Sequence, residues 1–143
     1  MARRRHDMAE AKVKPYPPSL LDLMASKTAI LMKARTFADM GMAETAQPMW
    51  AAAASCEERI APLLDALGRN LEAAASRISA ASCYQEGGDL SRAANLYRAA
   101  LAAPLRANTR QDVEAMLAGC LDELSRTALN GPSRRGGKLP AGT

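Results

Sequence analysis

The sequence predicts an all-α protein, and three observations support that prediction. Alanine dominates long stretches of the chain, and alanine loses no side-chain entropy on entering a helix. Valine, a residue typical of strands, occurs only at Val13 and Val113. Apolar residues recur at three- and four-residue steps through most of the region 19–129. We therefore expect five helices and no β-sheet.

The first hairpin is expected at 19–61. Its first helix begins near Leu20 and ends at Gly41, because glycine readily adopts the positive φ that closes a helix. Its second helix covers about 43–59. Proline inside that helix is tolerated only near the first turn, which is where Pro48 lies.

The second hairpin is expected at 62–108. Pro62 is typical of a helix start, so its first helix is predicted from Pro62 to about residue 86, ending at Gly87-Gly88. Asp89 is a suitable N-cap for the next helix, over 90–103.

A fifth helix is expected within 109–129, where one apolar stripe suits a helix that caps the stack. Residues 1–18 lack a sustained apolar period and are predicted to be a flexible basic arm. Residues 130–143 are rich in glycine and proline, which predicts a disordered basic tail.

The two hairpins are related by an internal repeat of 47 residues. The repeated positions are aromatic, glycine and alanine residues in the same order: Phe37, Gly41, Ala46, Trp50 and Ala53 align with Tyr84, Gly88, Ala93, Tyr97 and Ala100. Alanines allow two helices to approach closely, and the aromatic residues are expected to fill the remaining space between them.

This pattern resembles the tetratricopeptide repeat over about 80 of the 143 residues. The period differs from the family's 34 residues, so the first helix of each pair should be unusually long. The resemblance implies a solenoid fragment whose inner face comes from the first helix of each hairpin. It places a protein-binding groove at Thr28, Leu31, Arg35, Asp39, Ile78, Ser82, Gln85 and Glu86. The set lacks the lysine and asparagine with which some members of the family hold a terminal carboxylate.

Methionines supply a second set of candidate contacts. Met40 and Met42 flank the turn at Gly41 and are expected to be exposed. Flexible thioethers adapt to varied partner surfaces. Because about three repeats are normally needed for stability, we expect the open side of the first hairpin to contact another protein or a second copy of the chain.

Catalysis has little support in this sequence. The one histidine, His6, lies in the basic arm, and no pair of carboxylates stands out from ordinary solvated helix faces. Cys56, Cys83 and Cys120 lack metal-ligand spacing and are expected to be reduced core residues. We predict no enzyme activity, cofactor, metal site or small-molecule substrate.

The basic balance of the chain belongs to its ends. Residues 1–18 and 130–143 each carry a net charge of +3, whereas 19–129 carries −2, which sum to the +4 of the whole chain. Nucleic-acid contacts are therefore expected, if anywhere, at Arg3, Arg4, Arg5, Arg134 and Arg135.

Two functions remain open from the sequence. The first is a cytoplasmic protein-interaction module, such as an adaptor, a chaperone-like protein or an accessory subunit of a larger complex. The alternative is an accessory component of a nucleoprotein complex whose basic arms contact DNA or RNA. No stretch approaches the roughly 18 apolar residues that a membrane span requires.

Overall fold

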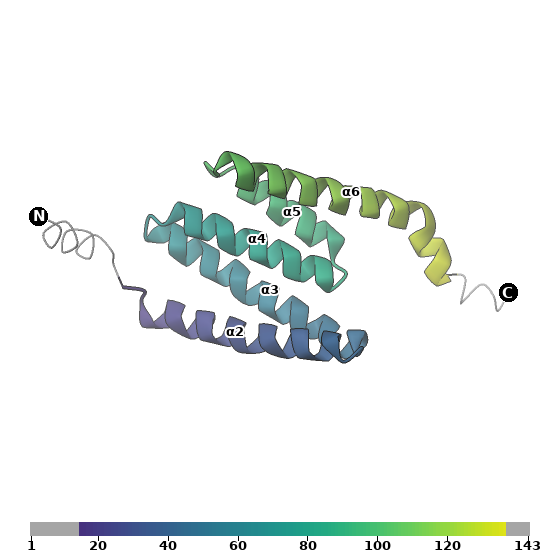
Figure 1. The fold of residues 1–143 in the computed structure, drawn as a ribbon, viewed down its shortest axis with the longest axis horizontal. Coiled ribbons are helices and arrows are strands. Elements are labelled where there is room, and N and C mark those ends of the chain that lie inside the picture. Colours follow the sequence, from purple (N-terminus) through teal and green to yellow (C-terminus); the bar gives the residue numbers. More distant parts are fainter. Residues whose placement is uncertain (1–14, 137–143) are drawn as a thin grey trace, which may run out of the picture.

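Five helices and no strand make up the part of the chain that the computed structural model describes, which is the backbone of residues 15–136 and the side chains of residues 15–130. The helices are α2 (Pro18–Asp39), α3 (Ala43–Ala66), α4 (Asn70–Glu86), α5 (Leu90–Leu101) and α6 (Ala107–Gly136). Each helix packs against the next one along the chain, as Figure 1 shows. The predicted all-α stack of two hairpins and a further helix is confirmed.

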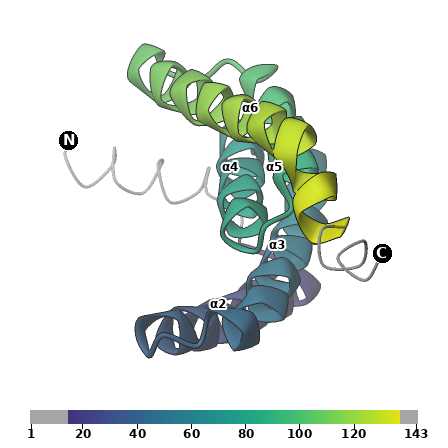
Figure 2. The same ribbon diagram turned by 90° about the vertical axis from the view of Figure 1, so that its right-hand side faces the viewer.

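The stack is curved. Figure 2 shows the helices following an arc, with α4 on its inner side and α3 and α5 on its outer side. Helix α3 packs against both α2 and α4, so it joins the two hairpins. Helix α2 lies at one end of the arc and α6 at the other.

Three glycines make the turns between the first four helices. Gly41, Gly68 and Gly88 have φ angles of +78°, +75° and +88°. In each turn the amide after the glycine donates to the carbonyl five residues earlier, at 2.8 Å from Met42 to Phe37, 2.9 Å from Arg69 to Leu64 and 2.8 Å from Asp89 to Tyr84. This is the bonding of a Schellman C-cap, which satisfies carbonyls at the helix end. The predicted turns at Gly41 and Gly88 are confirmed.

The predicted boundary between the hairpins at 61/62 is wrong, because α3 continues through Pro62 as far as Ala66. Pro62 is exposed, whereas Ile60, Ala61 and Leu64 around it are buried. Proline removes only one backbone donor, and burying this apolar face offsets that loss. Helix α4 therefore has 17 residues, against 22 for α2, so the long first helix is not repeated in the second hairpin.

The described residues extend into both predicted terminal segments. Helix α2 begins at Pro18, and Tyr16 just before it is tied to the second hairpin, since its hydroxyl donates to Glu72 Oε1 at 2.5 Å. The Arg69 guanidinium lies 4.2 Å from the centroid of the Tyr16 ring, a cation–π contact. At the other end α6 extends to Gly136, so residues 130–136 are helical rather than disordered. Residues 1–14 and 137–143 lie outside the described part.

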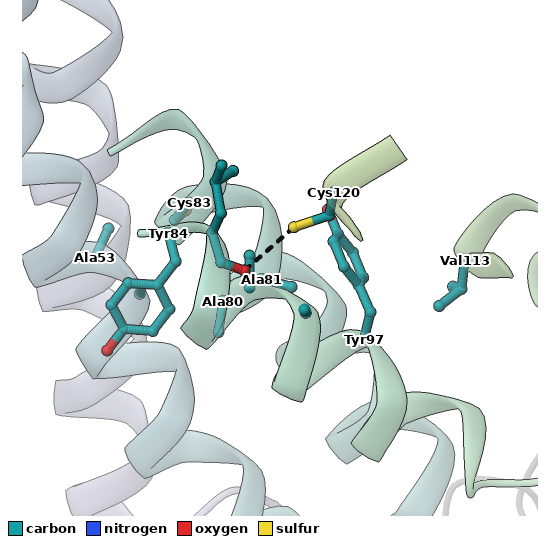
Figure 3. Packing of buried hydrophobic residues seen from close by; sticks show 12 residues of the cluster. Ala53, Ala80, Ala81, Cys83, Tyr84, Tyr97, Val113 and Cys120 are labelled. Atoms are coloured by element: carbon teal, nitrogen blue, oxygen red, sulfur yellow. Dashed lines mark hydrogen bonds between the residues drawn. The ribbon is translucent and has the colours of Figure 1, made fainter. Parts of the chain in front are cut away.

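The main core is built from small residues around two tyrosines. Ala53, Ala80 and Ala81 are fully buried in one cluster with Tyr84 and Tyr97, and Figure 3 shows them together. Alanine lets neighbouring helices approach closely, and the aromatic rings supply most of the volume between them. Helix α6 covers this cluster through buried Val113 and Cys120, in agreement with its predicted capping role.

The aromatic positions of the two hairpins differ in their surroundings. Tyr84 and Tyr97 share the main cluster, as expected from the repeat. Trp50 packs against the same cluster, but Phe37 lies half-buried beside Met49 at a separate surface depression. The end of the first hairpin that carries Phe37 is therefore more open than the matching part of the second.

Candidate functional site

A groove of about 420 Å³ lies between α2 and α4, with α3 behind it. Lys27, Leu31 and Arg35 come from α2, at four-residue steps that place them on one helix face. Helix α4 contributes the opposite wall and α3 the floor. The residues from these two helices are Trp50 and Glu57 from α3, and Ile78, Ser79, Ser82, Cys83 and Glu86 from α4.

Five of the eight predicted groove residues line this groove, namely Leu31, Arg35, Ile78, Ser82 and Glu86. Thr28, Asp39 and Gln85 are not among the lining residues. Thr28 is exposed and its hydroxyl donates to the Met24 carbonyl at 3.0 Å. Gln85 faces α5 instead, because its Oε1 accepts a 2.8 Å hydrogen bond from the Tyr97 hydroxyl. The binding role of the five that do line the groove stays a prediction.

The charged groups at the rim are available to a ligand. Arg35 and Glu86 are both exposed, and within the described residues neither forms an ion pair or a hydrogen bond. The same groove is lined by the apolar side chains of Leu31, Trp50 and Ile78, all partly buried. The groove thus combines apolar lining residues with the paired charges of Lys27 and Glu57 and with two charges that have no partner among the described residues, Arg35 on α2 and Glu86 on α4.

Sequence reasoning missed the residues that α3 brings to the groove. Trp50 was assigned to the interior of the hairpin, whereas it lines the groove as well as packing on the core. Glu57 is one of the carboxylates that the sequence predicts on solvated helix faces, yet the residue is only 5% exposed. A signal for Glu57 exists in the sequence, since it lies one turn from each of the buried residues Ala53 and Ile60.

Glu57 is held in place by polar neighbours. Lys27 Nζ lies 3.6 Å from its Oε2, and the Ser76 and Ser79 side chains also favour the charged form of the carboxylate. Burial nevertheless raises the pKa of Glu57, and these partners only partly oppose the effect. The carboxylate is therefore a buried structural group whose charge is partly compensated by Lys27.

The thiol of Cys83, which also lines the groove, is unreactive. Burial, and then the negative charge of Glu57, raise the pKa of the Cys83 thiol to about 11. A thiol with such a pKa is protonated at neutral pH and does not act as a nucleophile. All three cysteines are free and buried.

Replacing Glu57 by glutamine is expected to stabilise the protein at neutral pH. Because the folded-state pKa is raised above the unfolded value, the charged form of Glu57 lowers stability above that folded pKa. The penalty disappears as the pH falls through the folded pKa to below the usual value of 4.5. Urea unfolding across this pH range should show Glu57→Gln more stable near pH 7 and equal to wild type in acid.

The exposed Glu114 of α6 provides the control for that measurement. Glu114→Gln should change the urea midpoint little at any pH, because its carboxylate is solvated in both states. A Glu57→Gln protein that is less stable than wild type at pH 7 would contradict the expectation.

The other predicted contacts have different locations. Met40 and Met42 are 63% and 41% exposed at the turn after α2, as expected. Arg3, Arg4, Arg5 and His6 lie outside the described residues, as do the side chains of Arg134 and Arg135. The nucleic-acid contacts therefore stay predictions.

Comparison with known proteins finds no matching family model, no curated relative and no similar solved structure. Among residues 15–136 no helix is long and apolar enough to cross a membrane. Within the same range no cluster of three or more histidine, cysteine or acidic side chains is arranged to hold a metal ion.

Proposed function

We propose that this chain is a tetratricopeptide-like interaction module that binds a segment of another protein in the groove between α2 and α4, without catalysing a reaction. The observation behind this proposal is the lining of the groove. Three partly buried apolar side chains line the groove together with Arg35 and Glu86, two exposed charges without partners among the described residues. Such a site suits an adaptor, a chaperone-like protein or an accessory subunit.

The mode of binding follows from the arrangement of these groups. An apolar side chain of the partner would contact Leu31, Trp50 and Ile78, where removing apolar surface from water supplies most of the affinity. The guanidinium of Arg35 presents a planar fork that suits a partner carboxylate, and Glu86 suits a partner cation. These two polar contacts would fix the orientation of the bound segment.

The absence of catalysis in this proposal rests on the chemistry of the groove. Its titratable groups besides the rim charges are Lys27 paired with Glu57, and the protonated thiol of Cys83. Neither arrangement provides an activated nucleophile beside a base. We place the protein in the cytoplasm, because three free cysteines suit a reducing compartment.

Arg35→Glu is the direct test of groove binding. The wild-type protein would first be co-purified from its native host, and the recovered protein identified by mass spectrometry. Calorimetric titration of that protein should then give a Kd at least tenfold weaker for Arg35→Glu, because charge reversal places repulsion where an ion pair forms. The melting temperature should be unchanged, since Arg35 is exposed.

Arg98→Glu is the matched control, because Arg98 is an exposed arginine of α5 that does not line the groove. It should bind like wild type. Equal affinity of the wild type and Arg35→Glu for the identified protein would rule out the groove as the binding site.

A further inference from the structure

The outward face of α2 is an unpartnered helix surface. Helix α2 packs mainly against α3, and its buried residues are Leu20 and Ala34. On the side away from α3 it carries an uncharged stripe at three- and four-residue steps. The stripe residues are all exposed: Leu21, Ala25, Thr28, Ala29, Met32 and Thr36. Leu21 and Met32 are 50% and 62% exposed, which is unusual for such large apolar side chains.

A shallow depression of about 480 Å³ lies at the C-terminal end of this stripe. It is lined by Met32, Lys33, Thr36 and Phe37 of α2, together with Met49 of α3. Apart from the lysine and threonine, its walls are thioether and aromatic groups that adapt well to an apolar side chain. The stripe thus carries a projecting leucine near one end and an apolar depression near the other.

These two features are complementary when α2 meets a second α2 in the opposite direction. Leu21 and Thr36 lie equally far from the centre of the stripe, between Thr28 and Ala29, at about 11 Å along the helix axis on either side. A twofold axis through that centre brings Leu21 of each copy onto Met32 and Thr36 of the other, at the edge of the depression that adjoins the stripe. The small residues at the centre, Ala25, Thr28 and Ala29, allow the two helices to approach closely.

The charges beside the stripe fit the same arrangement. Asp22 and Lys33 lie on one flank of α2, and neither forms an ion pair with another described residue. In an antiparallel pair related by a twofold axis, the same flanks of the two helices adjoin. Asp22 of each copy then lies near Lys33 of the other, which gives two symmetry-related ion pairs.

We propose that α2 is a self-association surface, through which two copies of this chain pair antiparallel with Leu21 of each packed on Met32 and Thr36 of the other. The groove between α2 and α4 is separate from this face, so both can be occupied together. Pairing would make the protein a bivalent module with two outward-facing grooves.

The first test is the concentration dependence of molecular mass by sedimentation equilibrium. Wild type is expected to be dimeric. Leu21→Glu should weaken the dimer about a hundredfold, because one substitution removes a leucine from the interface in both copies. Leu129→Glu replaces the 80% exposed Leu129 of α6 and should leave the dimer unchanged. A monomeric wild type at 100 µM (about the highest working concentration) overturns the proposal and leaves this face to a different protein.

The second test is a charge exchange that checks the direction of pairing. Asp22→Lys and Lys33→Asp should each weaken the dimer several-fold, since each places like charges together, and the double variant should recover wild-type affinity. Ala29→Cys should cross-link between copies under mild oxidation, because position 29 lies beside the twofold axis and the native cysteines are buried. A dimer whose affinity ignores the charge exchange and which Ala29→Cys does not cross-link would show a different interface.

Discussion

Tyr97→Ala is expected to cost about 3–5 kcal/mol of the free energy of unfolding. Tyr97 is fully buried and is the largest side chain in the described core that water does not reach. Its ring fills the space between α4, α5 and α6, where the neighbouring residues are mostly alanines that cannot expand into a cavity. A protein of this size typically has about 5–15 kcal/mol of stability, so urea unfolding should show a large fall in the midpoint.

Tyr97→Phe separates the ring from the hydroxyl in that experiment. The hydroxyl donates to Gln85 Oε1 at 2.8 Å and lies 3.4 Å from Ser82 Oγ. Removing it should cost about 1 kcal/mol, since Gln85 is only half-buried and can turn to water. A Tyr97→Ala protein that loses no more stability than Tyr97→Phe would show that the ring is not the element that fills this core.

Ala81→Leu is expected to cost about 3 kcal/mol, for the opposite reason. Ala81 is fully buried in α4, within the cluster formed with α3 and α5. Leucine is nearly as good a helix former as alanine, so the loss measured by thermal or urea unfolding would report packing rather than helix propensity. The added carbons have no space because the helices meet through small residues.

Ala99→Leu is the matched control, an exposed position of α5 where the same change should alter stability by less than about 0.5 kcal/mol. If Ala81→Leu were as stable as Ala99→Leu, the helices around Ala81 would not be in close contact.

The turns could be predicted from the sequence where glycine and the following helix signal coincide. Gly41 and Gly88 end their helices as expected, and Asp89 Oδ1 accepts a hydrogen bond of 3.2 Å from the Arg92 amide. Gly68 makes the same kind of turn, but the sequence predicts an uninterrupted helix there because Pro62 is typical of a helix start. A proline is a strong local signal, and it misleads where a buried face continues on either side of it.

The groove could be predicted in part for a related reason. Leu31, Arg35 and Ile78 follow from the tetratricopeptide resemblance, which implies that the first helix of each hairpin forms the inner face. Trp50 and Glu57 reach the same space from α3, and no periodicity within α2 or α4 reveals that. Their contribution depends on the separation of α2 and α4, which leaves part of α3 accessible between them.

The sequence by itself determined the helical class, two of the interhelical turns and the stripe by which α6 caps the stack, because alanine content, glycine positions and apolar spacing act within one or two helical turns. Only the tertiary structure decided that α3 passes through Pro62, that Tyr16 is tied to Glu72 and that Glu57 is buried beneath the groove. Each of these depends on contacts between different helices, where burial of a whole face outweighs the preference of a single residue.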